Sequence, residues 1–285
     1  MRLLPSLLLA FTFVTTAHAA TPVCNPELNT PQKPFRIYGN TYYVGTHGVS
    51  SVLVVSDKGL VLIDGDLARS VPQIAANIAA LGFRVSDVKL ILNSHVHCDH
   101  AGGIAALQTM SGAEVKASPW SAEVLRHGGV GRDDPQYGIE EPIAAVARVS
   151  TIGDRETIKL GSLALTAHFT PGHTPGGTSW TWVSCAGKRC LHMVYADSLS
   201  AISEPDFRFS AHPKTVADFR KSFAVMETLP CDVLVTVHPE VNDLWSRLDK
   251  RAHGAPDALI DPSACRNLAA AARANFDKRL AKEAK

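Results

Sequence analysis

The segment His95-Val96-His97-Cys98-Asp99-His100 constrains this chain most strongly, because it holds three histidines and one aspartate within six residues. Side chains at i and i+2 point the same way only in extended or loop backbone, so His95 and His97 can face one site. Asp99 and His100 follow at the predicted start of a helix. Imidazole and carboxylate are the ligands of zinc sites that keep one position open for water. The segment therefore predicts a catalytic metal site rather than a polar loop with scattered histidines.

Two further histidines extend the pattern. His173 lies in the Pro/Gly-rich run 170–179, which fixes a tight loop at the end of a predicted strand, and His238 directly follows an apolar strand. Strand ends can line one shared rim of a sheet. Two zinc ions held there would lower the pKa of a shared water and generate hydroxide at neutral pH. We expect one zinc to be held by His95, His97 and His173, and the other by Asp99, His100 and His238.

The first twenty residues differ from the rest of the chain. Arg2 gives a positive start, residues 3–14 are almost all apolar, and Ala17-His18-Ala19 is typical of a signal-peptidase site. We interpret residues 1–20 as a cleaved secretory signal, too short to span a membrane, and we expect a periplasmic protein. The mature chain, residues 21–285, is predicted to be a single domain and a monomer.

Charge and composition exclude some partners. The formal net charge is +1, and no basic stripe or polybasic tail is present. Neither a nucleic acid nor a membrane is therefore expected as a partner of the mature chain.

Four of the six cysteines suggest pairs, since export permits disulfides. Cys185 and Cys190 flank what is predicted to be a hairpin tip, which a disulfide could pin. Cys231 and Cys265 stand just before a strand and at the start of the last helix. Closing that loop would contribute about 3–4 kcal/mol in the chain-entropy model.

The other two cysteines leave alternatives open. Cys24 and Cys98 are either free or paired, if the N-terminal arm reaches back to the histidine segment. Period-two alternation puts Cys98 on the opposite side from His97. We therefore interpret Cys98 as buried or disulfide-bonded rather than as a zinc ligand, although a thiolate binds zinc strongly.

Apolar periodicity predicts an α/β fold. The order of elements suits two sheets packed face to face with helices outside, in two similar halves. Helices are predicted at 71–81 (with Ser70 as N-cap), 101–108, 119–126, 215–229 and 263–282, and residues 128–141 form an irregular loop. Strands are predicted at 35–38, 41–44, 51–56, 60–64, 88–93, 114–117, 157–160, 163–169, 178–184, 191–195 and 233–237.

These motifs together resemble the metallo-β-lactamase superfamily, whose hallmark His-x-His-x-Asp-His is present from His95 to His100. The run Leu62-Ile63-Asp64-Gly65 is similar to its first motif, in which the aspartate supports the metal site from behind the ligands. The runs 170–180 and 195–200 are more specific and resemble class B, subclass 3 β-lactamases. Cys231 and Cys265 match a disulfide common in that subclass. The resemblance implies an αβ/βα sandwich of two mixed sheets with helices on the outer faces.

The resemblance also implies an activity, the zinc-dependent hydrolysis of the β-lactam ring of penicillins, cephalosporins and carbapenems, and hence antibiotic resistance. A metal-bound bridging hydroxide, oriented by Asp99, would attack the lactam carbonyl. The zinc of the His95 set would stabilise the oxyanion, and the zinc of the Asp99 set the departing nitrogen. Ser198 and Ser200 would bind the substrate carboxylate, although Ser200 could equally cap a turn.

Two other functions remain open at this point. A secreted lactonase or thioesterase of the same superfamily would use Asp197 as a carboxylate bridging both metals. We match Ser198, not Asp197, to the position that faces the site in subclass 3, which leaves Asp197 turned away or behind the ligands. A protein that only stores zinc would close its coordination with four protein ligands, which the Gly-rich loop at His173 disfavours. No supported Ser-x-x-Lys motif suggests a serine β-lactamase.

Overall fold

The computed structural model describes residues 24–285, and the predicted signal peptide lies outside these residues. The strands are β1 Phe35–Tyr38, β2 Thr41–Tyr43, β3 Val52–Ser56, β4 Gly59–Ile63, β5 Val88–Leu92, β6 Glu114–Ala117, β7 Val149–Thr151, β8 Thr157–Leu160, β9 Leu163–Phe169, β10 Thr178–Ala186, β11 Arg189–Ala196 and β12 Val233–Thr236. The α-helices are α1 Val71–Ala80, α2 Cys98–Ala101, α3 Ile104–Ser111, α4 Pro119–His127, α5 Pro213–Thr228, α6 Leu244–Ala252 and α7 Ala264–Glu283. Short 3-10 helices include η1 Pro26–Asn29 and η5 Pro239–Asn242. Within this part of the chain, no helix is both long and apolar enough to cross a membrane.

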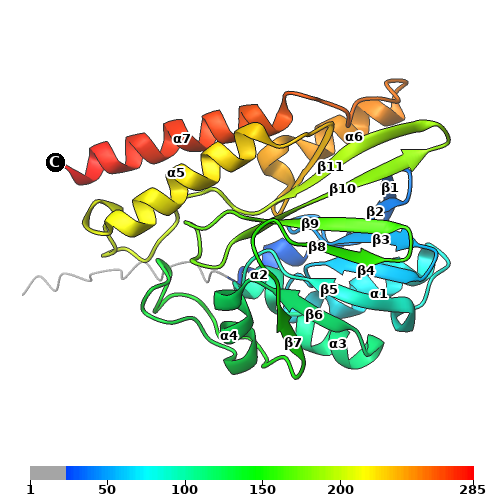
Figure 1. Cartoon of the computed structure of the whole chain (residues 1–285), viewed down its shortest axis with the longest axis horizontal. Helices are drawn as coiled ribbons and strands as arrows, with labels where there is room; N and C mark the ends of the chain where they lie inside the picture. Colours follow the sequence, from blue (N-terminus) through cyan, green and yellow to red (C-terminus); the bar gives the residue numbers. More distant parts are fainter. Residues whose placement is uncertain (1–23) are drawn as a thin grey trace, which may run out of the picture.

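The strands form two mixed sheets. A seven-stranded sheet runs in the order β1-β2-β3-β4-β5-β6-β7, and a five-stranded sheet in the order β12-β11-β10-β9-β8. Strands β4 to β7 are parallel to one another, as are β11 and β12, while the hairpin-linked strands pair antiparallel. Figure 1 shows the two sheets between α1, α3 and α4 on one side and α5 and α7 on the other.

Three apolar layers hold this arrangement together, and period-two alternation of the strands builds them. In β4, Val61 and Ile63 face the other sheet, whereas Leu60 and Leu62 pack with the residues of α1 and α3. In the other sheet, Tyr195 faces inward and its neighbours pack against α5 and α7. The fold is therefore the predicted αβ/βα sandwich, with helices covering both outer faces.

Most predicted elements are present with ends within two residues of those expected, but some expectations were wrong. The predicted helix 101–108 is two helices, α2 and α3, separated at Gly102 and Gly103. Ser70 does not cap α1 with its side chain, because its backbone is already helical, with φ −79° and ψ −14°, whereas an N-cap residue is not. Its hydroxyl donates to Asn29 Oδ1 at 2.6 Å. Strand β7 and helix α6 were not predicted. Strand β7 is three residues long and is defined only by its pairing with β6.

Three disulfides cross-link the described chain. Cys185 pairs with Cys190 across the tip of the β10–β11 hairpin, and Cys231 pairs with Cys265 between the start of β12 and α7. Cys24 is bonded to Cys98, so the N-terminal arm does reach back to the histidine segment.

Candidate metal centre

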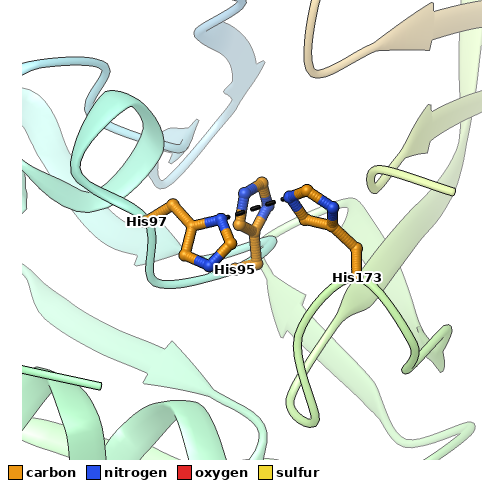
Figure 2. A group of neighbouring side chains, drawn as sticks. All are labelled: His95, His97 and His173. Atoms are coloured by element: carbon orange, nitrogen blue, oxygen red, sulfur yellow. Dashed lines mark hydrogen bonds between the residues drawn. The ribbon is translucent and has the colours of Figure 1, made fainter. Parts of the chain in front are cut away.

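The predicted ligands come from loops at the ends of three strands, which explains how residues far apart in sequence meet. His95 follows β5, His173 follows β9 and His238 follows β12, while α2 begins directly after His97. The strands β5 and β9 belong to different sheets, so the site lies where strand ends of the two sheets meet. Figure 2 shows the rings of His95, His97 and His173 converging from these two directions.

The first cluster consists of these three histidines. All are buried, and their ligand atoms lie within 4.8 Å of one another. His97 Nδ1 is 3.1 Å from His173 Nε2, the contact drawn in Figure 2. The ring centroid of His95 is 4.9 Å from that of His97 and 4.9 Å from that of His173. Three imidazoles thus point into one small volume.

The outward nitrogen of each of these rings faces a hydrogen-bond acceptor. His95 Nδ1 donates to Asp197 Oδ1 at 2.7 Å, and His173 Nδ1 donates to the Ser200 carbonyl at 2.9 Å. His97 Nε2 lies 3.3 Å from both carboxylate oxygens of Asp134. Each acceptor holds the ring proton on the outward nitrogen, so the inward nitrogen carries a lone pair.

Converging lone pairs indicate that the cluster fits a cation. Two unprotonated nitrogens 3.1 Å apart repel unless a positive charge or a donor lies between them. Gln136 Nε2 offers such a donor, 3.2 Å from His97 Nδ1 and 3.4 Å from His173 Nε2. His95 Nε2 is buried without any hydrogen-bond partner. These three nitrogens are a suitable donor set for a zinc ion with a fourth position left open.

The electrostatics keep two of these rings neutral, which is the form that binds metal. Burial, and then the neighbouring histidines, hold the pKa of His95 and of His173 well below the usual 6.5. Burial also lowers the pKa of His97, but its contact with Asp134 and the charge of Glu140 outweigh burial and raise it.

A second cluster lies beside the first. Asp99 Oδ2 is 3.3 Å from His100 Nε2 and 3.4 Å from His238 Nε2, and these two nitrogens are 3.3 Å apart. His238 Nδ1 donates to the Gly48 carbonyl at 3.2 Å, which turns its Nε2 toward Asp99. Burial opposes ionisation of Asp99, but the neighbouring histidines prevail and its pKa falls well below the ordinary range. A carboxylate and two imidazoles therefore face one point.

Asp64 lies behind the first cluster rather than in it. Its carboxylate accepts hydrogen bonds from the Ser94 amide at 2.7 Å and from the Tyr195 hydroxyl at 2.8 Å, and it also contacts the Ser94 hydroxyl. Burial raises its pKa to about 7. These contacts fix the turn between β5 and His95, and so determine where that histidine stands.

The predicted substrate-binding serines lie in the loop that follows β11. Ser198 Oγ and Ser200 Oγ are 2.8 Å apart, and both residues line the cavity in which the two clusters are found. This cavity has a volume of about 1020 Å³ and extends along one face of α7. The serines thus face the same space as the histidines, at a distance that lets both hydroxyls bind one anionic group.

Asp197 lies behind the ring of His95. It is fully buried and its Oδ1 contacts the outward nitrogen of His95, on the opposite side of the ring from the cluster. Burial raises its pKa well above the usual range.

The sequence did not indicate which residues of one loop contact the histidine segment. Residues 131–140 contribute Asp134 to His97, Gln136 to the first cluster, and Glu140 to the backbone amide of Cys98 at 2.5 Å. The Gly-, Asp- and Pro-rich composition of this loop predicted its irregular backbone. The composition of the loop does not predict these contacts, because they join residues about forty positions apart in sequence.

Comparisons with known proteins agree with this geometry. The profile of the family described as the metallo-beta-lactamase superfamily matches residues 44–238. The chain belongs to this superfamily. It is 55% identical to the solved structure of Rm3 metallo-beta-lactamase, covering 94% of this chain and 100% of that chain at a TM-score of 0.91. It is 49% identical to MEM-A1, a subclass B3 metallo-beta-lactamase from a soil metagenome library, covering 90% and 98% of the two chains at a TM-score of 0.88. Its subclass is therefore B3.

Curated sequence relatives are more distant. A hydroxyacylglutathione hydrolase of Anaeromyxobacter dehalogenans is 38% identical over 92 residues, which is 32% of this chain. A probable metallo-hydrolase of Burkholderia pseudomallei is 35% identical over 112 residues, or 37% of this chain. The matches span only 28% and 34% of these two proteins, so the chain covers about a third of their length.

Proposed function

We propose that this protein is a zinc-dependent β-lactamase that hydrolyses the β-lactam ring of penicillins, cephalosporins and carbapenems. The observation that carries the proposal is the pair of adjacent donor clusters, His95, His97 and His173 in one and Asp99, His100 and His238 in the other, in an open cavity. Its similarity to subclass B3 enzymes over 98–100% of their chains supports the same activity.

Each cluster would hold one zinc ion. His95, His97 and His173 supply three imidazole nitrogens. Asp99, His100 and His238 supply one carboxylate and two nitrogens. When bound, two zinc ions lower the pKa of a shared water and polarise the lactam carbonyl.

The chain's own residues position the reactants. Asp99 remains ionised at neutral pH and accepts a hydrogen bond from the attacking water, which orients it. Ser198 and Ser200 donate hydrogen bonds to the substrate carboxylate without a fixed positive charge. Asp197 and Asp134 hold the rings of His95 and His97 in place, which spares reorganisation during the reaction.

The alternative is a secreted lactonase or thioesterase of the same superfamily. That function would require Asp197 to bridge the two metals. The hydrogen bond of Asp197 to the outward nitrogen of His95 favours β-lactam hydrolysis instead.

We also propose that the protein is exported to the periplasm and acts as a monomer. The three disulfides support an oxidising compartment. Mass spectrometry of the N-terminus after expression with the full leader would test cleavage after Ala19 or Ala20, and light scattering would test the monomer.

The decisive experiment is the hydrolysis of a carbapenem by the purified mature protein, before and after chelation and after zinc is restored. Turnover that disappears with the chelator and returns with zinc is expected. Absence of turnover in protein carrying two zinc ions would refute β-lactam hydrolysis, and thioester and lactone substrates would then be assayed.

A further inference from the structure

A disulfide fastens the N-terminal arm, residues 24–34, beside the metal centre. Cys24 is bonded to Cys98, and Cys98 stands between two of the proposed zinc ligands. Both cysteines are buried with Leu67 in a small apolar cluster, against which Leu28 packs. The first residue of the arm is thus covalently bonded to the segment that carries the proposed ligands.

The arm in turn holds the loop of residues 45–50. The Thr46 hydroxyl donates to the Leu28 carbonyl at 2.7 Å. The His47 amide donates to the Thr30 carbonyl at 2.8 Å. These two bonds join the loop to Leu28 within η1 and to Thr30 directly after it, so displacement of the arm would release the loop.

This loop orients one of the proposed ligands. The Gly48 carbonyl accepts the hydrogen bond from His238 Nδ1, and this bond fixes the direction of His238 Nε2. A Cβ atom on Gly48 would lie 2.7 Å from Leu28 Cα, so loop and arm are in direct contact at this residue. His238 is also the least buried of the proposed ligands, with 25% of its side chain exposed, and so depends most on this contact.

The arm also forms part of the substrate cavity. Leu28 lines the same cavity as His97, Asp99 and Ser198. Its side chain is half-buried and apolar, so it offers a hydrophobic surface to the part of a substrate that lies away from the reacting bond.

We propose that the Cys24–Cys98 disulfide is a positioning element of the active site. It holds the arm so that the Gly48 carbonyl keeps His238 aimed at the second metal, and so that Leu28 contacts the substrate. The inference rests on the proposed zinc centre and on β-lactam hydrolysis, and it adds a dependence of both on a covalent bond outside the ligand set.

The test compares C24A/C98A with C185A/C190A, which removes the disulfide of the β10–β11 hairpin, whose cysteines do not line the cavity. Zinc affinities are measured by competition with a chromophoric chelator. We expect the parent and the control to bind two zinc ions alike. In C24A/C98A the site that includes His238 should lose about 10- to 100-fold in affinity, as when a ligand loses its hydrogen-bonded support. One of the two measured affinities should therefore fall while the other is unchanged. Two affinities equal to those of the parent would overturn the proposal.

Leu28→Ala tests the contact with substrate separately, because it leaves the disulfide and the loop contacts in place. We expect KM for β-lactams with bulky side chains to rise by about three- to tenfold, with kcat changed less than about twofold and zinc affinity unchanged. An unchanged KM would remove Leu28 from the substrate-binding surface.

A further variant covers the case in which C24A/C98A does not fold. Thr46→Val keeps the disulfide but removes the hydroxyl that joins loop to arm, and it should weaken the same zinc site. Zinc binding by the parent without β-lactam turnover would refute the proposed activity and leave the effect on affinity measurable. A parent that binds fewer than two zinc ions would refute the second metal site and the positioning of His238 with it.

Discussion

Replacing Glu140 by glutamine should make the protein more stable at alkaline pH and change little at acid pH. The Glu140 side chain is largely buried, its Oε1 accepts the hydrogen bond from the Cys98 amide, and its Oε2 has no hydrogen-bond partner. Burial is the main reason that its pKa rises from an ordinary 4.5 to about 7, and the carboxylates of Asp99 and Asp134 add to it.

The sign follows from proton binding. Between about pH 4.5 and pH 7 the folded protein keeps a proton on Glu140 that the unfolded chain has released. The free energy of unfolding therefore falls as the pH rises through this window, and the loss is complete above it. A pKa rise from 4.5 to about 7 corresponds to about 3 kcal/mol. Glutamine cannot ionise, yet its carbonyl can still accept the Cys98 hydrogen bond.

The assay is urea unfolding at about pH 4 and about pH 8, with metal removed because zinc binding has its own pH dependence. We expect Glu140→Gln to match the parent at the lower pH and to exceed its free energy of unfolding by up to about 3 kcal/mol at the higher pH. Buried carboxyls that do not interact with Glu140 affect both proteins equally and cancel in the difference. Glu141→Gln, at the exposed neighbouring position, is the control and should follow the parent throughout. An equal difference between Glu140→Gln and the parent at both pH values would refute the reasoning.

Three further changes test the site and its support. His173→Ala removes one of the converging imidazoles, so metal analysis should find one zinc ion fewer and the rate of hydrolysis should fall by roughly 100-fold or more. The circular dichroism spectrum should match that of the parent. Full activity would contradict the ligand assignment. Asp197→Asn keeps a hydrogen-bond acceptor for His95 but removes the negative charge. Competition with a chelator should then show a zinc affinity about 10- to 100-fold lower than that of the parent. An affinity equal to that of the parent would mean that this charge does not support the ligand. C231A/C265A removes a disulfide that joins residues with a sequence separation of 34. Urea unfolding should show that the free energy of unfolding falls by about 4 kcal/mol, and a loss below about 1 kcal/mol would contradict the chain-entropy estimate.

Elements with strong local patterns could be predicted from the sequence. The run 88–92 is apolar except for Lys89, and it is a strand in which every residue but Lys89 is buried. The turn signals between β10 and β11 indicated the hairpin to within two residues, and its disulfide is present. The short strand β7 could not be predicted, because three residues have no periodicity and only pairing with β6 defines them. Ser70 is a residue type typical of helix N-caps, but its backbone is helical and its hydroxyl donates to Asn29, which is distant in sequence.

The sequence by itself predicted the proposed donor groups of the metal centre and determined the fold class. Both depend on spacing along one segment or on apolar alternation, which are local properties of the chain. Only the tertiary structure decided which groups support the ligands. Asp134 meets His97, Gly48 meets His238 and Cys24 meets Cys98 across long sequence separations. The sequence around a single carboxylate, carbonyl or thiol does not indicate which distant residue it will contact. These contacts therefore depend on how the two sheets and the N-terminal arm pack together.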